Sequence, residues 1–159
     1  MKLLIISDSH GNIENLKHVM GFAKKIKVGA VIHCGDWNYP ISVDTVSNFN
    51  IPIYAVVGNA DINPEIVRKL KLCAEKFSDN SLKFEIDKIK IGITHKPSDI
   101  QKYFSDSDLD IIFCGHLHSQ NESEFNGVKV VRPGALEISI NFAVYDTVTK
   151  KIEFINEQI

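Results

Sequence analysis

Short apolar segments that alternate with helical segments constrain the fold of this chain most. Residues 3–6, 30–32 and 53–57 are mostly apolar runs of the kind found in strands buried on both faces. Residues 13–26 follow the first run, and their apolar side chains recur every three or four positions, which predicts an amphipathic helix. A weaker helical pattern over 43–49 precedes the third run. Strands that alternate with helices predict crossover connections and a buried parallel sheet.

The second half of the chain has a different pattern. Alternating or β-rich residues there predict antiparallel strands and hairpins at 82–86, 90–93, 125–128, 142–145 and 152–155. Residues 110–114 form one more continuously apolar run. Because no linker, low-complexity tract or internal repeat interrupts residues 1–159, we expect one α/β domain with a mixed sheet system.

Composition and charge exclude several classes of protein. With 44% hydrophobic and 24% charged residues, the chain has the composition of a folded domain. Its 18 Lys and Arg against 20 Asp and Glu give a net charge of −2, without the basic excess of a nucleic-acid-binding protein. No apolar run approaches the roughly 20 residues of a membrane helix, and no signal peptide is recognised. Three Cys residues without CxxC spacing indicate no disulfide framework, so we expect a cytoplasmic protein.

Polar clusters directly follow five of the apolar segments. They are Asp8-Ser9-His10, Gly35-Asp36, Gly58-Asn59-Ala60-Asp61, Thr94-His95 and Gly115-His116-Leu117-His118. In sheets with crossover helices, ligand sites form at the carboxyl ends of the strands. The five clusters can therefore converge on one place.

The chemistry of these clusters indicates a metal centre. Carboxylate, imidazole and amide groups without a thiolate suit Mn²⁺, Fe²⁺ or Zn²⁺ better than a structural zinc site. The ligands are too many for one ion, and a carboxylate such as Asp36 could bridge two ions about 3.5–4 Å apart. A Gly precedes Asp36, Asn59 and His116, which fits a site where backbone segments approach closely.

Each cluster also has an explanation without metal when it is taken alone. Asp8 or Ser9 could cap the predicted helix, and Gly-Asp and Gly-Asn are common turn dipeptides. Thr94-His95, just before Pro97, could begin a helix. The occurrence of all five clusters in this order favours a metal centre.

Several residues near the clusters are expected to serve the core. His33 lies inside an apolar run and is expected to be a hydrogen-bonded core residue, and Cys34 and Cys114 are expected to pack as small apolar residues. Trp37 and Tyr39 follow Asp36 closely. They are either core aromatics or rings that stack on a substrate.

The five clusters, with Gly11-Asn12 and the segment Arg132-Pro133-Gly134-Ala135, resemble the motifs of the calcineurin-like metallophosphoesterase superfamily. Within it the chain is similar to the small YfcE-type phosphodiesterases. The resemblance spans nearly the whole chain and implies a four-layer αββα sandwich of two mixed sheets, with a two-metal centre at one edge. It implies Asp8, His10, Asp36 and His118 as ligands of one ion, and Asp36, Asn59, His95 and His116 as ligands of the other. We expect Mn²⁺ by preference, with Ni²⁺, Fe²⁺ and Zn²⁺ as alternatives.

The resemblance also implies a metal-dependent phosphodiesterase, in which a hydroxide bridging the two ions attacks a small phosphate ester. Asp36, Asn59 and Asp61 are the expected catalytic residues. Asn12, Asn59 and Lys96 are the expected contacts of the substrate, although Lys96 could instead point to solvent. We expect no nucleic acid or membrane as a partner, and exposed strands of the second half could pair in a homodimer. The alternative function is a non-catalytic protein-binding scaffold of the same fold, similar to the retromer subunit Vps29.

Three positions depart from the motifs of the superfamily. Ala60 stands where many members carry a His that protonates the leaving group, and Lys96 follows His95 where a Gly is usual. Ala135 and Glu137 stand in a segment that often holds a Ser and an Arg. Because a methyl group cannot donate a proton, we expect substrates with good leaving groups or a different acid.

Overall fold

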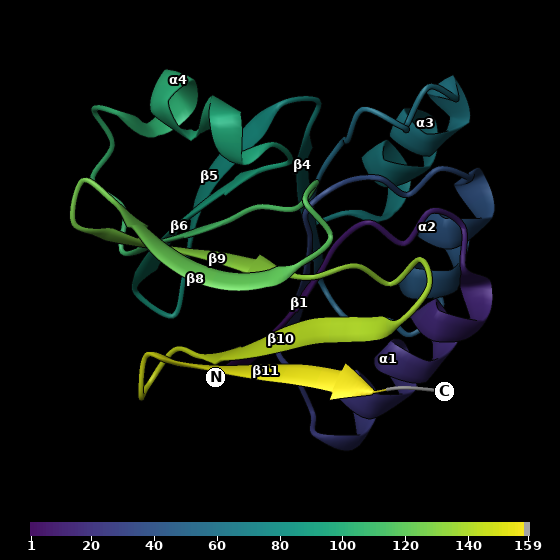
Figure 1. Cartoon of the computed structure of the whole chain (residues 1–159). Coiled ribbons are helices and arrows are strands. Elements are labelled where there is room, and N and C mark those ends of the chain that lie inside the picture. Colours follow the sequence, from purple (N-terminus) through teal and green to yellow (C-terminus); the bar gives the residue numbers. More distant parts are fainter. Residues whose placement is uncertain (158–159) are drawn as a thin grey trace.

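Two β-sheets lie face to face in the computed structural model, which describes residues 1–157 (Figure 1). The first sheet has the strand order β11-β10-β1-β2-β3-β4. Its strands are β1 (Lys2–Ile6), β2 (Ala30–His33), β3 (Ile53–Val56), β4 (Lys76–Ser78), β10 (Ile140–Asp146) and β11 (Lys151–Glu157). The second sheet has the order β5-β6-β7-β9-β8. Its strands are β5 (Ser81–Ile86), β6 (Ile89–Thr94), β7 (Ile111–Phe113), β8 (Gln120–Phe125) and β9 (Val128–Pro133).

Helices cover the outer faces of both sheets. Helices α1 (Ile13–Lys25), α2 (Pro40–Ser47) and α3 (Pro64–Cys73) lie beside the first sheet in Figure 1, and the short η1 (Pro97–Asp99) and α4 (Ile100–Phe104) lie beside the second. The layers are therefore helix, sheet, sheet and helix, and the predicted four-layer αββα sandwich of two mixed sheets is confirmed. Within residues 1–157, no helix is both long and apolar enough to cross a membrane.

Three apolar clusters fill the spaces between these layers. The largest packs the buried faces of α1, α2 and α3 against the first sheet and includes the fully buried Trp37 and Phe142. A second cluster, with Ile5 and Phe113, lies between the two sheets. A smaller third cluster, around Ile100 and Val130, lies under α4 on the outer face of the second sheet. This packing holds the four layers together and leaves the carboxyl ends of the parallel strands at the surface.

Both sheets have parallel central strands. In the first sheet β1, β2, β3 and β4 are parallel, and in the second β6, β7 and β9 are parallel. The antiparallel strands and hairpins predicted in the second half are confirmed as the pairs β5–β6, β8–β9 and β10–β11, and β10 also pairs antiparallel with β1. Between β6 and β7 the chain crosses over through η1 and α4, so that β7 runs parallel to β6. The sequence did not predict this crossover, because the helical pattern between the two strands is short.

The helix boundaries show how local residues act. α1 begins at Ile13 as expected, but its cap is Asn12, whose side chain accepts a hydrogen bond from the Asn15 N–H at 3.0 Å. The suggestion that Asp8 or Ser9 caps this helix is wrong, because both residues precede Asn12 in the loop. The second helix begins at Pro40 rather than at residue 43, since Pro is favoured in the first helical turn. α3 was not predicted, although Asn63 and Pro64 are a cap and a first residue of the usual kind.

Candidate metal centre

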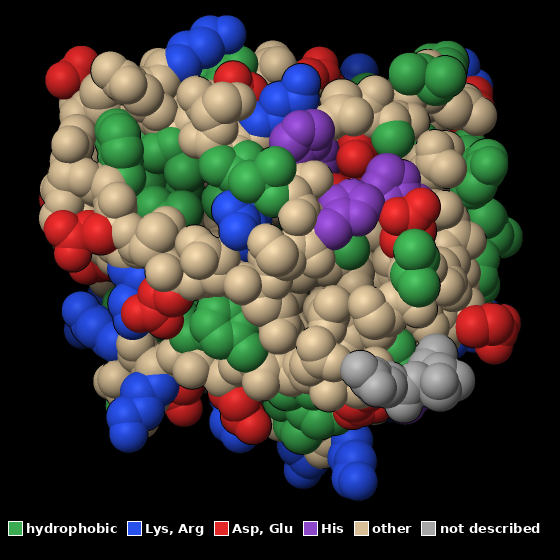
Figure 2. Space-filling view, in the orientation of Figure 1, with side chains coloured by type: hydrophobic (Ala, Val, Ile, Leu, Met, Phe, Trp, Pro, Cys, Tyr) green, Lys and Arg blue, Asp and Glu red, His purple; other side chains and the backbone are tan. Residues whose placement is uncertain are grey.

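All seven predicted metal ligands lie at the carboxyl ends of parallel strands. Asp8 and His10 follow β1, Asp36 follows β2, Asn59 follows β3, His95 follows β6, and His116 and His118 follow β7. The two sheets end at the same edge of the sandwich, so residues more than 100 positions apart meet there. Figure 2 shows several His side chains gathered with acidic side chains on this part of the surface.

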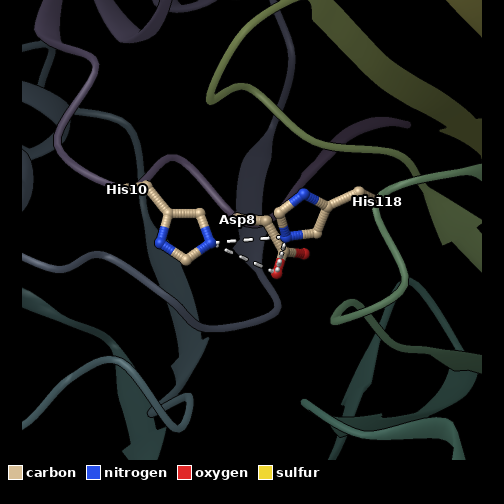
Figure 3. Close-up of side chains that lie close together, drawn as sticks. All are labelled: Asp8, His10 and His118. Atoms are coloured by element: carbon tan, nitrogen blue, oxygen red, sulfur yellow. Dashed lines mark hydrogen bonds and ion pairs between the residues drawn. The ribbon is translucent and has the colours of Figure 1, made fainter.

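One group of potential ligands consists of Asp8, His10 and His118, whose side chains point toward one another (Figure 3). One ligand atom from each lies within 4.8 Å of the others. The His10 Nε2 and His118 Nε2 atoms are 3.4 Å apart, and His118 Nε2 lies 3.4 Å from Asp8 Oδ1. The Asp8 carboxylate is fully buried and accepts the backbone N–H of His116 at 3.0 Å. This hydrogen bond joins the loop after β1 to the loop after β7.

A second group consists of Asp36, His95 and His116, again with ligand atoms within 4.8 Å of one another. His95 Nε2 lies 3.3 Å from Asp36 Oδ2 and 3.0 Å from Asn59 Oδ1. The His116 ring stands edge-on to the His95 ring, with their centroids 5.1 Å apart. Asp36 and His95 are buried, whereas Asn59 is exposed, so this group opens toward solvent on the Asn59 side.

Asp36 lies between the two groups. Its Oδ2 atom is 3.5 Å from His10 Nε2 and 3.3 Å from His95 Nε2. Two ligand atoms of one ion are typically about 3 Å apart when bonds of about 2.1 Å meet at a right angle. The distances from Asp36 Oδ2 to the His nitrogens of both groups are therefore close to those expected between ligands of one ion.

The hydrogen bonds of His95 test whether a cation fits here. Its Nδ1 atom lies 2.8 Å from the Cys34 carbonyl oxygen, which can only accept, so Nδ1 carries a proton and, in the neutral ring, Nε2 keeps its lone pair. That lone pair faces the Asp36 carboxylate and the Asn59 oxygen. Three acceptor atoms that converge without a donor repel one another unless a cation lies between them. The donor set of this second group therefore fits a divalent metal ion.

The electrostatics of the buried pair agree with this arrangement. Burial favours the neutral form of Asp36, but the His95 ring and the Ala60 N–H outweigh it and hold the pKa of Asp36 below its ordinary value. Burial likewise lowers the pKa of His95, but the Asp36 carboxylate outweighs it and raises this pKa above its ordinary value. The pKa of His116 is lowered by burial and by the neighbouring His95 and Lys96. The position next to Asp36 thus favours a positive charge.

Two glycines allow the loops to approach as closely as the site requires. A Cβ atom on Gly58 would lie 2.1 Å from Asp36 Oδ1 and 2.4 Å from the Asp36 backbone nitrogen. A Cβ atom on Gly115 would lie 2.0 Å from Ser7 Oγ and 2.6 Å from Asp8 Oδ2. The expectation that Gly before Asn59 and His116 marks close backbone approach is confirmed.

Asp61 occupies a different place from the other predicted site residues. Its Oδ2 accepts the backbone N–H groups of Gly58 at 2.8 Å and Asp36 at 3.0 Å, and its Oδ1 accepts that of Asn38 at 2.7 Å. Burial, and the nearby Asp36, raise the pKa of Asp61 above its ordinary value despite these bonds. With both oxygens on backbone N–H groups, Asp61 joins the loops after β2 and β3, and we expect it to act as a positioning residue.

A second buried network, formed by His33 and Ser9, holds the backbone of Asp36 in place. The sequence did not predict that these two residues support Asp36. The Gly35 N–H donates to His33 Nδ1 at 3.2 Å, so the proton on Nε2 faces Ser9 Oγ at 3.4 Å. The Ser9 hydroxyl donates to the Asp36 carbonyl at 3.4 Å. The His33 ring also stacks on Trp37, with centroids 3.5 Å apart. The expectation that His33 is a hydrogen-bonded core residue is confirmed, and Trp37 is a core aromatic.

Asn12 and Lys96, two of the predicted substrate contacts, differ in whether their polar groups already have partners in the protein. Asn12 caps α1 with its oxygen, and its Nδ2 group donates to the Glu137 carbonyl at 2.8 Å, so both ends of the amide are already used. Lys96 makes no ion pair with any other residue of the described range 1–157, and it lines a recess of about 190 Å³ with Asn59 and His95. Glu137, which was noted only as a departure, lies 3.5 Å from His118 Nδ1 and so turns His118 Nε2 toward Asp8.

Comparison with known proteins places this fold and site in a family. The model of the calcineurin-like phosphoesterase superfamily domain matches residues 1–150. The chain belongs to this superfamily. Phosphodiesterase MJ0936 of Methanocaldococcus jannaschii is 30% identical over 138 residues, which cover 84% of this chain and 83% of the relative. The solved structure of an archaeal phosphodiesterase is 28% identical, with a TM-score of 0.86, and covers 99% of this chain and 100% of that one.

More distant structures share the fold alone. The phosphoesterase YfcE of E. coli has a TM-score of 0.71 at 16% identity, and 98% of each chain is covered. Vps29 of Entamoeba histolytica in complex with Zn²⁺ has a TM-score of 0.66 at 16% identity, covering 98% of this chain and 99% of that chain. The predicted resemblance to YfcE-type phosphoesterases is confirmed, and the fold itself also serves in Vps29 proteins.

Proposed function

We propose that this protein is a phosphodiesterase that works with two divalent metal ions. The observation that carries the proposal is the position of Asp36, whose Oδ2 atom lies within 3.5 Å of a His nitrogen from each candidate ligand group. A carboxylate in that position can bridge two ions. Membership of the phosphoesterase superfamily and the 30% identity to a phosphodiesterase support the reaction class.

Seven side chains would hold the ions in this proposal. Asp8, His10, Asp36 and His118 would hold one, and Asp36, Asn59, His95 and His116 the other. The ions, of which Mn²⁺ suits these oxygen and nitrogen ligands well, supply an acidified water and positive charge for the phosphate oxygens. The protein fixes the ligands in advance, because Asp61 and the Ser9–His33 pair hold the Asp36 backbone from two sides.

The side chains that face the recess beside Asn59 would contact the phosphate. Asn59 can donate its amide N–H, and Lys96 offers an ammonium group without a carboxylate partner in residues 1–157. The backbone N–H of Ala60 donates to Asp36 Oδ1 at 2.8 Å, but its methyl side chain has no proton to give. The enzyme should therefore favour diesters with good leaving groups, such as aryl phosphates, over alkyl phosphates.

The test compares Asp36→Asn with the wild type on bis(p-nitrophenyl) phosphate in the presence of Mn²⁺. The variant should lose about a hundredfold or more of kcat/KM and bind less metal by elemental analysis, because the shared ligand is weakened for both ions. Asp106→Asn is the matched control, since Asp106 is exposed, lies outside this recess and is in neither ligand group. Equal activity of Asp36→Asn and wild type would contradict the bridged centre.

A scaffold function similar to that of Vps29 is separated by the same assay. Metal content alone does not discriminate, because one Vps29 structure holds Zn²⁺. Bound metal without hydrolysis of any diester would favour the scaffold, whereas hydrolysis that depends on Asp36 favours the enzyme.

A further inference from the structure

A cavity of about 350 Å³ lies on the outer face of the second sheet, near the metal-ligand loops. Pro97 and Ile100 form its wall on the side of η1 and α4, and Phe125 and Val130 form its wall on the strands β8 and β9. Figure 2 shows hydrophobic side chains beside the His cluster on the same face of the molecule. Cavities of this size bind small molecules or single ring systems rather than macromolecules.

Segments that carry metal ligands continue directly into the cavity. Pro97 lies two residues after His95, and Cys114 lies two residues before His116. Two residues of extended chain span about 7 Å. A phosphodiester held at the metal centre by its phosphate could therefore extend one of its two ester groups into this space.

Arg132 provides the polar contact of the cavity. Its Nε and one terminal nitrogen donate to the carbonyl and hydroxyl of Ser119, at 3.1 and 2.9 Å, which leaves other guanidinium N–H groups to a ligand. Within residues 1–157 no carboxylate lies within 4.0 Å of this guanidinium, although Glu124 also lines the cavity. The Cys114 thiol also lines the cavity and adds small, weakly polar surface.

We propose that this cavity binds the non-leaving ester group of the substrate, and that this group is an aromatic ring with an anionic or acceptor substituent. The inference rests on the proposed function, since it names the class of diester that the same metal centre hydrolyses. The apolar walls bind the ring, and Arg132 binds the substituent through charge-assisted hydrogen bonds. The second ester group thus determines specificity at a distance from the reacting phosphorus.

The kinetic test varies the second ester group while p-nitrophenolate remains the leaving group. The wild type should cleave p-nitrophenyl phenyl phosphate about tenfold better in kcat/KM than p-nitrophenyl methyl phosphate, and the 4-carboxyphenyl diester better still. Ser123→Phe places a ring in the cavity, because Ser123 lines it and pairs with Val130. This variant should reduce the phenyl-to-methyl ratio to near one, and Arg132→Gln should abolish the added preference for the carboxylate.

Glu122→Phe is the matched control on the opposite face of β8, where Glu122 pairs with Val131. It should keep the wild-type phenyl-to-methyl ratio. A ratio that stays high in Ser123→Phe, or that falls equally in Glu122→Phe, would overturn the proposal.

A binding measurement separates this proposal from the proposed function. Diphenyl phosphate at millimolar concentration, titrated into the full chain with Mn²⁺ replaced by diamagnetic Zn²⁺, should shift the methyl NMR signals of Ile100 and Val130. Shifts without hydrolysis of any diester would leave the subsite standing and refute the enzyme. Hydrolysis with unmoved methyl signals and an unchanged ratio would refute the subsite and leave the phosphodiesterase standing. If neither hydrolysis nor shifts occur, both proposals are wrong.

Discussion

Replacement of Asp61 by Asn tests whether this carboxylate positions the site or takes part in the reaction. In the wild type, its two oxygens accept three backbone N–H groups, from Asp36, Asn38 and Gly58. The amide of Asn keeps one oxygen, which can still accept two of these bonds. Its NH₂ group must then face a backbone N–H in a buried place, so one charge-assisted bond is lost and two donors oppose each other.

The expected cost is about 2–3 kcal/mol of unfolding free energy, as for a lost hydrogen bond to a charged group. Removal of the buried charge returns part of the desolvation penalty that raises the pKa of Asp61, so the cost stays below the sum of three bonds. For a chain of 159 residues this corresponds to a fall in Tm of about 4–12 °C. Because Asp61 holds the backbone of Asp36 and Gly58, metal affinity should fall as well, by about tenfold to a hundredfold.

Urea denaturation of the metal-free protein and a titration with Mn²⁺ measure the two effects separately. Asp106→Asn makes the same chemical change at an exposed residue of the described chain and should alter neither quantity. If Asp61→Asn loses activity while its stability and metal affinity match the wild type, Asp61 acts on the substrate and the positioning role is wrong. If stability falls by less than about 1 kcal/mol, the three hydrogen bonds do not carry the energy assigned to them here.

Two further predictions concern the supporting residues. Burial lowers the pKa of His33 to about 3, so the unfolded chain binds a proton between pH 6.5 and 3 that the folded chain does not. The free energy of unfolding should therefore decrease as the pH falls below 6.5, and His33 should account for about 2 kcal/mol of this loss by pH 5. Urea denaturation at a series of pH values should show a weaker pH dependence for His33→Gln than for the wild type. Equal pH dependence in the two proteins would contradict this prediction. Gly58→Ala should lower metal affinity at least tenfold by elemental analysis and titration, because its Cβ would lie 2.1 Å from Asp36 Oδ1. Gly21→Ala is the control, because nothing lies within 4 Å of a Cβ atom there, and it should raise the free energy of unfolding by about 0.5–1 kcal/mol. If Gly58→Ala binds metal as tightly as the wild type, the steric argument is refuted.

The sequence predicted those parts of the fold that depend on local pattern. The apolar runs at β1, β2 and β3 and the periodic α1 agree with the structure, because burial on one or both faces leaves a direct mark on residue type. The parallel pairing of β6, β7 and β9 was less visible. The connection between β6 and β7 contains only the short η1 and α4, whose few residues give little helical periodicity. Pattern alone could not distinguish this crossover from a loop.

The candidate ligands were predictable because each directly follows an apolar run, and the carboxyl ends of parallel strands meet at one edge. The residues that hold them in place were not. Asp61 was expected to be catalytic from the motif, whereas its three backbone hydrogen bonds lead us to predict a positioning role. His33 and Glu137 contact the site across 24 and 19 positions of sequence, through Ser9 and His118 respectively. Such pairings depend on how the loops fold over one another, which residue type and spacing do not encode.

The backbone of the ligands shows why the site needs so much support. Five of the seven candidate ligands have positive φ angles: Asp8 (51°), His10 (42°), Asp36 (60°), His116 (73°) and His118 (54°). A residue with a side chain typically pays about 1 kcal/mol or more in this left-handed region, so the five together cost an amount comparable to the net stability of a small domain. Such conformations persist only where neighbouring contacts determine them. The hydrogen bonds of Asp8 with His116, and those of Asp61 and Ser9 with the Asp36 backbone, are contacts of that kind, and they connect loops that the strained residues occupy. Side chains two residues apart share a face on an extended strand, yet His116 and His118 belong to different ligand groups, so their left-handed conformations let one loop serve both groups.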